Sequence, residues 1–178
     1  MTRDYILTGA PGAGKTSILR QLQAEGLDVV EEAATDVIAL EQGRGVAEPW
    51  TQPAFIESVA RLQLQRMAQP PAGMARVMDR SLICTLALAE YLGHPVPETL
   101  TRAIGEAIDG GRFERRVMLV ESLGFITPTE ARRISLAESQ RFERFHVDAY
   151  ERLGFELVRI PAMAVVERTA LVRSLIDA

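Results

Sequence analysis

Residues 9–16 read GAPGAGKT, and this stretch decides how the rest of the sequence is interpreted. It matches the pattern G-x-x-x-x-G-K-[ST], in which glycines let successive backbone N–H groups turn toward one anion. An apolar run at residues 4–8 precedes it, and an amphipathic run at residues 15–25 follows it. A strand before the loop and a helix after it form the context in which this pattern binds phosphate. The stretch therefore predicts a phosphate-binding loop.

Lys15 is the only lysine in the chain, and arginine supplies all the other permanently basic side chains. A lysine is a compact point charge on a flexible stem, whereas arginine carries a planar fork. We interpret Lys15 as a retained lysine, because the planar guanidinium of arginine would not fit a loop that wraps around phosphate. We expect Lys15 to reach the outer phosphates of ATP and the Thr16 hydroxyl to ligate Mg²⁺. The predicted nucleotide-binding residues are Gly9, Ala10, Pro11, Gly12, Ala13, Gly14, Lys15, Thr16 and Ser17.

Length and composition limit the class of protein. The 178 residues are enough for one domain with a core, so residues 1–178 are expected to form a single nucleotide-binding domain. The net charge of −4, with both signs interspersed, argues against a nucleic-acid surface. Cys84 is the only cysteine, which excludes an internal disulfide and favours a cytoplasmic location. No apolar run approaches the length of a membrane span.

Apolar strands alternate with helical patterns along the chain. The expected strands are residues 4–8, 27–31, 75–78, 116–120 and 155–160. The expected helices are residues 15–25, 33–43, 52–68, 82–92, 98–109 and 163–177, with a long helix ending at Arg152. This alternation predicts a parallel sheet covered by helices on both faces, with ligands at the carboxyl ends of the strands. Residues 33–70 form a helical excursion on the side expected to hold an acceptor.

Two acidic residues are expected at such strand ends. Asp79 ends the strand ARVMD and is a candidate second ligand of Mg²⁺, although aspartate also caps helices. Glu32 follows the run VVE and is the candidate base that takes a proton from an attacking hydroxyl or water. Asp36, one helical turn later, is the second candidate for that base. An acid at a helix start is also stabilised there by the helix dipole, which is the structural alternative for Glu32.

Arg132 and Arg133 lie between two helix-capping signatures, residues 127–130 (TPTE) and residues 135–138 (SLAE). The break predicts a lid over residues 124–135, from which an arginine can cover the transferring phosphoryl group. Two exposed arginines at a helix end are the alternative.

The guanine-reading pattern N-K-x-D is absent, because the chain contains no asparagine and no second lysine. Guanine recognition of that type is therefore not expected. The loop at residues 161–163 (PAM) is a candidate support for the edge of a base.

With these residues assembled, the chain resembles a family of small bacterial predicted ATPases. That family is grouped with the nicotinamide-riboside kinase domain of NadR and with the TRPL translocation-defect proteins. The matching segments are residues 5–19 (YILTGAPGAGKTSIL), 29–38 (VVEEAATDVI), 79–81 (DRS) and 124–135 (GFITPTEARRIS). The resemblance implies a three-layer P-loop kinase fold with the sheet order 2-3-1-4-5 and a lid near residues 125–135.

The same analogy makes Glu32 and the pair Asp79-Arg80 look like the base-and-metal set of deoxyribonucleoside kinases. Some members of the family are kinases, and others bind nucleotides or phosphoinositides. Our hypothesis is an ATP- and Mg²⁺-dependent phosphotransferase for a small nucleoside-like metabolite. The alternatives are an NTPase switch, in which Glu32 orients water, and a binding module without turnover. The sequence leaves the oligomeric state open.

Overall fold

The fold is described by a computed structural model for residues 3–123 and 135–178. In chain order the elements are β1 (Arg3–Thr8), α1 (Lys15–Ala24), β2 (Asp28–Val30), α2 (Ala33–Gly43), η1 (Pro49–Thr51), α3 (Ala54–Met67), β3 (Ala75–Asp79), α4 (Leu82–Leu92), α5 (Glu98–Asp109), β4 (Arg116–Val120), α6 (Leu136–Arg152), β5 (Glu156–Ile160) and α7 (Val165–Ile176). Strands and helices alternate as the sequence predicts.

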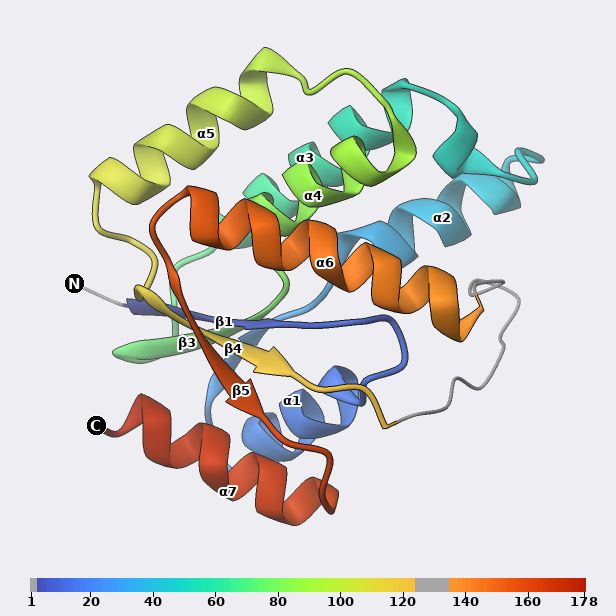
Figure 1. The fold of residues 1–178 in the computed structure, drawn as a ribbon. Coiled ribbons are helices and arrows are strands. Elements are labelled where there is room, and N and C mark those ends of the chain that lie inside the picture. Colours follow the sequence, from blue (N-terminus) through green and yellow to red (C-terminus); the bar gives the residue numbers. More distant parts are fainter. Residues whose placement is uncertain (1–2, 124–134) are drawn as a thin grey trace.

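One sheet organises the described residues, and its five parallel strands follow the order β2-β3-β1-β4-β5. In Figure 1, α1 and α7 cover one face of this sheet and α2 to α6 lie on the other. The predicted three-layer fold and strand order are therefore confirmed. Strand β1 lies between β3 and β4, so the loop that follows β1 emerges at the middle of the sheet's carboxyl edge.

Both faces of the sheet are buried, because neighbouring side chains along a strand point to opposite faces. Ile6 and Met78 enter the core beneath α2 to α6, whereas Leu7 and Val77 enter the core beneath α1 and α7. All four side chains are fully buried. The continuous apolar runs in the sequence reflect this burial from two sides.

Several predicted boundaries agree closely with the structure. The helices expected at residues 82–92 and 98–109 and the strand at 116–120 coincide with α4, α5 and β4. The capping box at the start of α6 is also confirmed. The Ser135 hydroxyl accepts a hydrogen bond from the Glu138 N–H at 3.2 Å, and the Glu138 carboxylate accepts one from the Ser135 N–H at 2.8 Å. Residues 127–130, the other capping signature, lie outside the described residues.

Three predicted elements need corrected boundaries, and the helix expected at 163–177 is Val165–Ile176. The strand expected at 27–31 is only Asp28–Val30, because β2 is an edge strand that pairs with β3 alone. The helix expected at 52–68 begins later, at Ala54, with Pro53 at its N-cap and the separate turn η1 before it. Proline is tolerated at a helix start, where its missing N–H is not needed, but not inside the helix.

An ion cluster closes the opposite edge of the sheet, at the amino ends of the strands. The buried Asp4 carboxylate accepts from Arg76 Nε and Nη2, both at 2.9 Å, and from Arg112 Nε at 2.8 Å. Two arginines on one carboxylate satisfy both of its oxygens, which burial requires. This cluster ties β1, β3 and the segment before β4 together, away from the phosphate loop.

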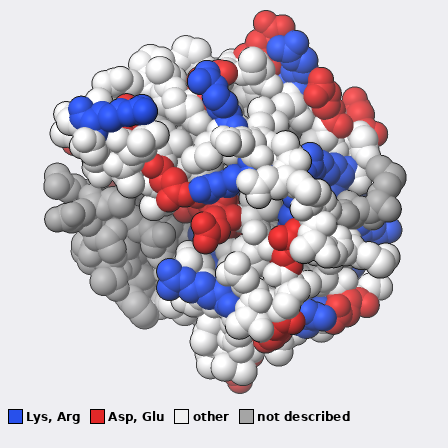
Figure 2. All heavy atoms as spheres, turned by 180° about the vertical axis from the view of Figure 1, so that it is seen from behind, with Lys and Arg blue, Asp and Glu red and all other residues white. Residues whose placement is uncertain are grey.

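The surface carries both signs of charge. On the face drawn in Figure 2, acidic and basic side chains alternate, and no broad basic area lies among the described residues there. Over residues 3–123 and 135–178, no helix combines the length and apolar character needed to cross a bilayer.

Candidate active site

The predicted phosphate loop connects β1 to α1 at the carboxyl edge of the sheet. Gly9, Gly12 and Gly14 have φ angles of 134°, 83° and 91°, in the region that favours glycine. A Cβ atom on Gly9 would lie 2.4 Å from the carbonyl oxygen of Val120, so β4 leaves no room for a side chain there. The loop therefore has the backbone conformation and the close strand contact for which its glycines were expected. Helix α1 then starts at Lys15, with Gly14 as its N-cap.

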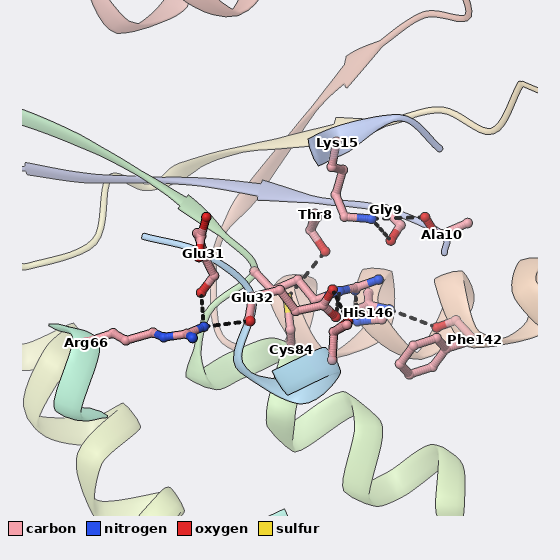
Figure 3. Close-up of polar contacts among 12 residues, drawn as sticks. Thr8, Gly9, Ala10, Lys15, Glu31, Glu32, Arg66, Cys84, Phe142 and His146 are labelled. Carbon is pink, nitrogen blue, oxygen red and sulfur yellow. Dashed lines mark hydrogen bonds and ion pairs between the residues drawn. The ribbon is translucent and has the colours of Figure 1, made fainter. Parts of the chain in front are cut away.

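The Lys15 side chain folds back over the loop. Its Nζ donates hydrogen bonds to the carbonyl oxygens of Gly9 at 3.1 Å and Ala10 at 3.0 Å, as Figure 3 shows. Burial, and then the positive charge of Arg80, lower the pKa of Lys15 to about 8, while the carboxylates of Asp79 and Glu32 act in the opposite direction. These electrostatic influences mean that the structure gathers Lys15, Glu32, Asp79 and Arg80 in one place.

Oxygen ligands suited to a hard cation are present beside the loop. Thr16 and Ser17 are exposed on the first turn of α1, and Asp79 is buried at the end of β3, opposite Leu7 of β1 in the parallel register. The alternative role of Asp79 as a helix cap is wrong, because the Ser81 hydroxyl caps α4 by accepting from the Ile83 N–H at 3.1 Å.

Mg²⁺ at phosphate sites takes one or two carboxylates and completes its shell with phosphates and water. A hydroxyl and a carboxylate beside the loop fit that requirement. Among the described residues, no three His, Cys, Asp or Glu side chains gather as a metal site built from protein alone.

Glu32 lies at the junction of β2 and α2, rather than at the end of the strand. It is the N-cap residue of α2, two positions after the last residue of β2. Its carboxylate accepts from Arg80 Nε at 2.9 Å and from the Thr35 hydroxyl at 3.2 Å. Arg66 of α3 donates to the carbonyl oxygens of Glu31 at 3.0 Å and Glu32 at 2.6 Å, which fixes the backbone of this junction (Figure 3).

Asp36, the second candidate for the base, faces a different partner. Its carboxylate is paired with Arg66, and it is not among the residues that line the cavity described next. Of the two candidates for the base, Glu32 is therefore the one that lines the cavity beside the phosphate loop.

A cavity of about 370 Å³ opens between the phosphate loop and the helices α2, α3, α4 and α6. Pro11, Glu32 and Arg80 line its polar end. Its other lining residues are mostly apolar and include four aromatic side chains, namely Trp50, Phe55, Tyr91 and Phe142. The volume lies within the range typical of small-molecule sites. The excursion between β2 and β3 thus supplies one wall of a pocket large enough for a second ligand beside the phosphates.

Gln63 of α3 is a lining residue that sequence reasoning missed. The residue is 2% exposed, and no atom of residues 3–123 or 135–178 accepts a hydrogen bond from its Nε2. A buried amide without a partner is costly, so such a group in a cavity indicates a ligand that hydrogen-bonds it. The feature of the sequence that could have identified Gln63 is a glutamine on the otherwise apolar face of a helix.

Arg168 of α7 was also missed. Its guanidinium donates to the carbonyl oxygens of Ala13 at 2.6 Å, Glu121 at 2.8 Å and Pro161 at 2.8 Å. This buried side chain therefore links the phosphate loop to the segments after β4 and β5. The predicted role of residues 161–163 beneath a base remains a prediction. Arg132 and Arg133 lie outside the described residues, so their predicted lid role also remains a prediction.

Comparison with protein families gives one match over most of the chain. Residues 4–168 match the family described as an AAA domain. The chain belongs to this family. Its strand order and glycine-rich loop agree with a P-loop fold, and no curated protein sequence matches the chain.

Solved structures with the same fold include deoxyadenosine kinase from M. mycoides. With dCMP product and a flexible dCDP bound, that enzyme superposes with a TM-score of 0.66 at 13% identity, covering 98% of each chain. With dATP bound it gives a TM-score of 0.67 at 12% identity, covering 99% of this chain and 100% of the other. This likeness shows that residues 3–123 and 135–178 have the P-loop kinase fold.

Proposed function

We infer that the chain is an ATP- and Mg²⁺-dependent phosphotransferase whose acceptor is a small nucleoside-like molecule with a free hydroxyl. The observation that carries this proposal is the continuous cavity from Pro11 of the phosphate loop, past Glu32, to the aromatic residues around Gln63. An enzyme that only hydrolyses a nucleotide needs no such second compartment. The fold shared with deoxyadenosine kinase also supports a phosphotransferase with a nucleoside-like acceptor.

At the phosphate end, the loop amides and the Lys15 ammonium hold the polyphosphate. The N-terminus of α1 adds its positive dipole end. The same groups stabilise the negative charge that spreads over the phosphoryl oxygens during transfer, which is the main catalytic contribution in such sites. Thr16 and Asp79 supply oxygen ligands for Mg²⁺, which neutralises phosphate charge when it is bound.

At the junction of β2 and α2, Glu32 receives the proton of the acceptor hydroxyl. The hydroxyl oxygen forms a bond to the γ-phosphorus while the bond from that phosphorus to the bridging oxygen of ADP breaks. The pairing of Glu32 with Arg80 orients the carboxylate. Arg132 or Arg133, expected from the sequence to cover the phosphoryl group, would complete the set of charges.

In the apolar part of the cavity, the aromatic side chains suit a flat ring and the Gln63 amide suits an edge that can hydrogen-bond. An amide group offers both a donor and an acceptor, so it matches a base edge that carries both. We expect Gln63→Met, which keeps the length of the side chain, to raise the acceptor KM about tenfold or more. Titration of MgATP into the same variant should give an unchanged Kd, because Gln63 lies away from the loop.

The experiment that tests the function is transfer from γ-labelled ATP to a panel of nucleosides and of non-nucleoside alcohols. At least one nucleoside should accelerate loss of label from ATP well above the rate with water alone. If every compound leaves that rate unchanged, the acceptor proposal is wrong, and slow hydrolysis would then favour the NTPase switch.

A matched pair of variants tests the base. Glu32→Gln should lower kcat by roughly 10²–10⁴-fold, the usual size of a general-base contribution, with little change in MgATP affinity. Glu31→Gln is the control, because this neighbouring carboxylate does not line the cavity. Equal activity of the two variants would show that Glu32 is not the base.

A closer relationship to the NadR and TRPL group is also proposed, and it rests only on the sequence segments that match that group.

A further inference from the structure

Arg80 is the charged side chain that pairs with the Glu32 carboxylate. Its φ of 68° makes it the non-glycine residue with a positive φ among those described, and its backbone N–H donates to the Leu7 carbonyl oxygen at 2.9 Å. An unfavourable backbone conformation in a non-glycine residue persists only where the surroundings enforce it, and such residues gather at functional sites. Here it turns the Arg80 side chain toward the cavity.

The second partner of Arg80, after Glu32, is His146 on α6. Arg80 Nη1 lies 2.8 Å from His146 Nε2, and the imidazole is fully buried. The other ring nitrogen, Nδ1, lies 3.0 Å from the carbonyl oxygen of Phe142. The Phe142 ring packs against the imidazole at 4.3 Å between centroids and lies 5.6 Å from Arg80 Cζ. His146 therefore has a defined partner at each nitrogen.

These partners fix the protonation of the ring. A guanidinium only donates, so Nε2 must accept, and a carbonyl oxygen only accepts, so Nδ1 must carry the proton. Burial, and then the charges of Arg80 and Lys15, lower the pKa of His146 well below its usual value, although the Phe142 carbonyl acts the other way. The ring is thus a neutral imidazole with its acceptor nitrogen aimed at Arg80.

We propose that His146 is a positioning residue for the phosphoryl transfer: by accepting a hydrogen bond from Arg80, it locks the guanidinium across the Glu32 carboxylate. Without this acceptor, a buried guanidinium N–H loses its partner, and the side chain rotates to find another. The Glu32 carboxylate then loses the orientation that the acceptor hydroxyl needs. The kinetic part of this inference rests on the proposed function, whereas its structural part does not.

The first test uses ¹⁵N NMR of the imidazole nitrogens, which the chain suits because it has only two histidines. His146 should be neutral with the proton on Nδ1 at pH 6.5, the ordinary pKa of a histidine. His94 serves as the internal reference for the other tautomer, because its Nε2 lies 2.8 Å from the Trp50 carbonyl oxygen and donates to it. A cationic His146, or a proton on its Nε2, overturns the proposal whatever reaction the protein performs.

The second test is kinetic, with the acceptor found in the panel. His146→Phe keeps a buried ring but removes the acceptor nitrogen, and kcat should fall about 10-fold to 100-fold with little change in either KM. His146→Gln, whose amide oxygen can accept from Arg80, should restore much of kcat. Thermal unfolding of each variant identifies loss of fold; if His146→Phe does not fold, His146→Gln and the NMR measurement decide.

A double-mutant cycle separates positioning from mere packing. Arg80→Lys replaces the guanidinium by an ammonium group. In this background, His146→Phe should lower kcat by much less than it does in the unmodified protein. Fully additive losses, or a His146→Gln variant as slow as His146→Phe, overturn the proposal. If no acceptor is phosphorylated, the proposed function fails, and the NMR result still decides the placement of His146.

Discussion

At the residue scale, the site depends on a few side chains whose surroundings change their chemistry. Lys15 is the main example, because it lies in a buried place next to another cation and has a pKa of about 8. The sequence could predict its position but not this shift. The shift arises first from burial and then from Arg80, which follows a different strand and comes close only in the folded chain.

The lowered pKa of Lys15 predicts pH-dependent binding. A polyphosphate favours the charged ammonium, so above pH 8 the binding of MgATP must be accompanied by proton uptake. The affinity should therefore fall as the pH rises from about 7.5 to 9.5, by at most tenfold for each pH unit. Calorimetry at pH 8.5 in two buffers of different ionisation enthalpy measures the uptake directly.

Lys15→Met is the control for that measurement. It should weaken MgATP binding at pH 7 by roughly 10-fold to 100-fold, the value of a charge-assisted hydrogen bond. The remaining binding should show no proton uptake. An affinity that is constant over the whole pH range would contradict the assigned environment of Lys15.

The residues that sequence reasoning missed have a common cause. Gln63, His146 and Arg168 belong to no motif. His146 and Arg168 gain their roles from partners far away in the chain, and Gln63 gains its role from the cavity that distant segments enclose. Local patterns cannot report that Arg80 and His146 meet. By contrast, Glu32 and Asp79 were predictable because the ends of parallel strands necessarily share one edge.

At the element scale, the boundaries that the sequence predicted best are those marked by helix-capping residues. Ser135 and Glu138 form the expected capping box, and Gly93 follows α4 in the left-handed conformation typical of a helix end. The edge strand β2 was predicted too long, since its length depends on how far β3 pairs with it. Pairing is a tertiary property that a short apolar run does not encode.

The ion cluster between elements predicts a loss of stability without a loss of binding. Asp4→Ala leaves Arg76 buried without its carboxylate, and removal of one partner from a buried pair costs about 3–5 kcal/mol. The unfolding free energy from urea titration should fall by that amount. The Kd of MgATP should not change while the variant is folded, because Asp4 lies at the opposite edge of the sheet.

Asp177→Ala supplies the comparison for this prediction. Asp177 pairs with Arg173 on the surface of α7, and exposed pairs contribute at most about 1 kcal/mol. A loss for Asp4→Ala as small as that for Asp177→Ala would mean that the cluster does not hold the strands together.

At the scale of the whole molecule, the residues that stabilise the fold and those of the candidate active site lie at opposite edges of the parallel sheet. The amino edge carries the Asp4 cluster, and the carboxyl edge carries the loop and the cavity. The strand order was expected only from the resemblance, because alternation alone allows several orders. The sequence predicted an acceptor site at residues 33–70 but not the shape of the cavity, since its walls come from α2, α3, α4 and α6 together.

This arrangement predicts that the two ligands stabilise the protein separately. MgATP at 100 times its Kd should add about 2.7 kcal/mol to the unfolding free energy, which raises the melting temperature by roughly 5–10 °C. A true acceptor should add a further increase in the presence of a non-hydrolysable ATP analogue. At the same MgATP concentration, Lys15→Met should keep only about 0.4–1.4 kcal/mol of the first increase, and Gln63→Met should lose only the second. A shift from the acceptor that Gln63→Met leaves unchanged would place that molecule elsewhere.

The solitary lysine has a practical consequence. Amine-directed acylating reagents have a single ε-amine to find in this chain, and it lies at the bottom of the phosphate loop with a pKa of about 8. An acyl-phosphate derivative of ATP delivers its acyl group to that amine, and mass spectrometry of one peptide then reads out occupancy. The native protein can in this way report its own nucleotide preference in crude mixtures, before any substrate has been identified.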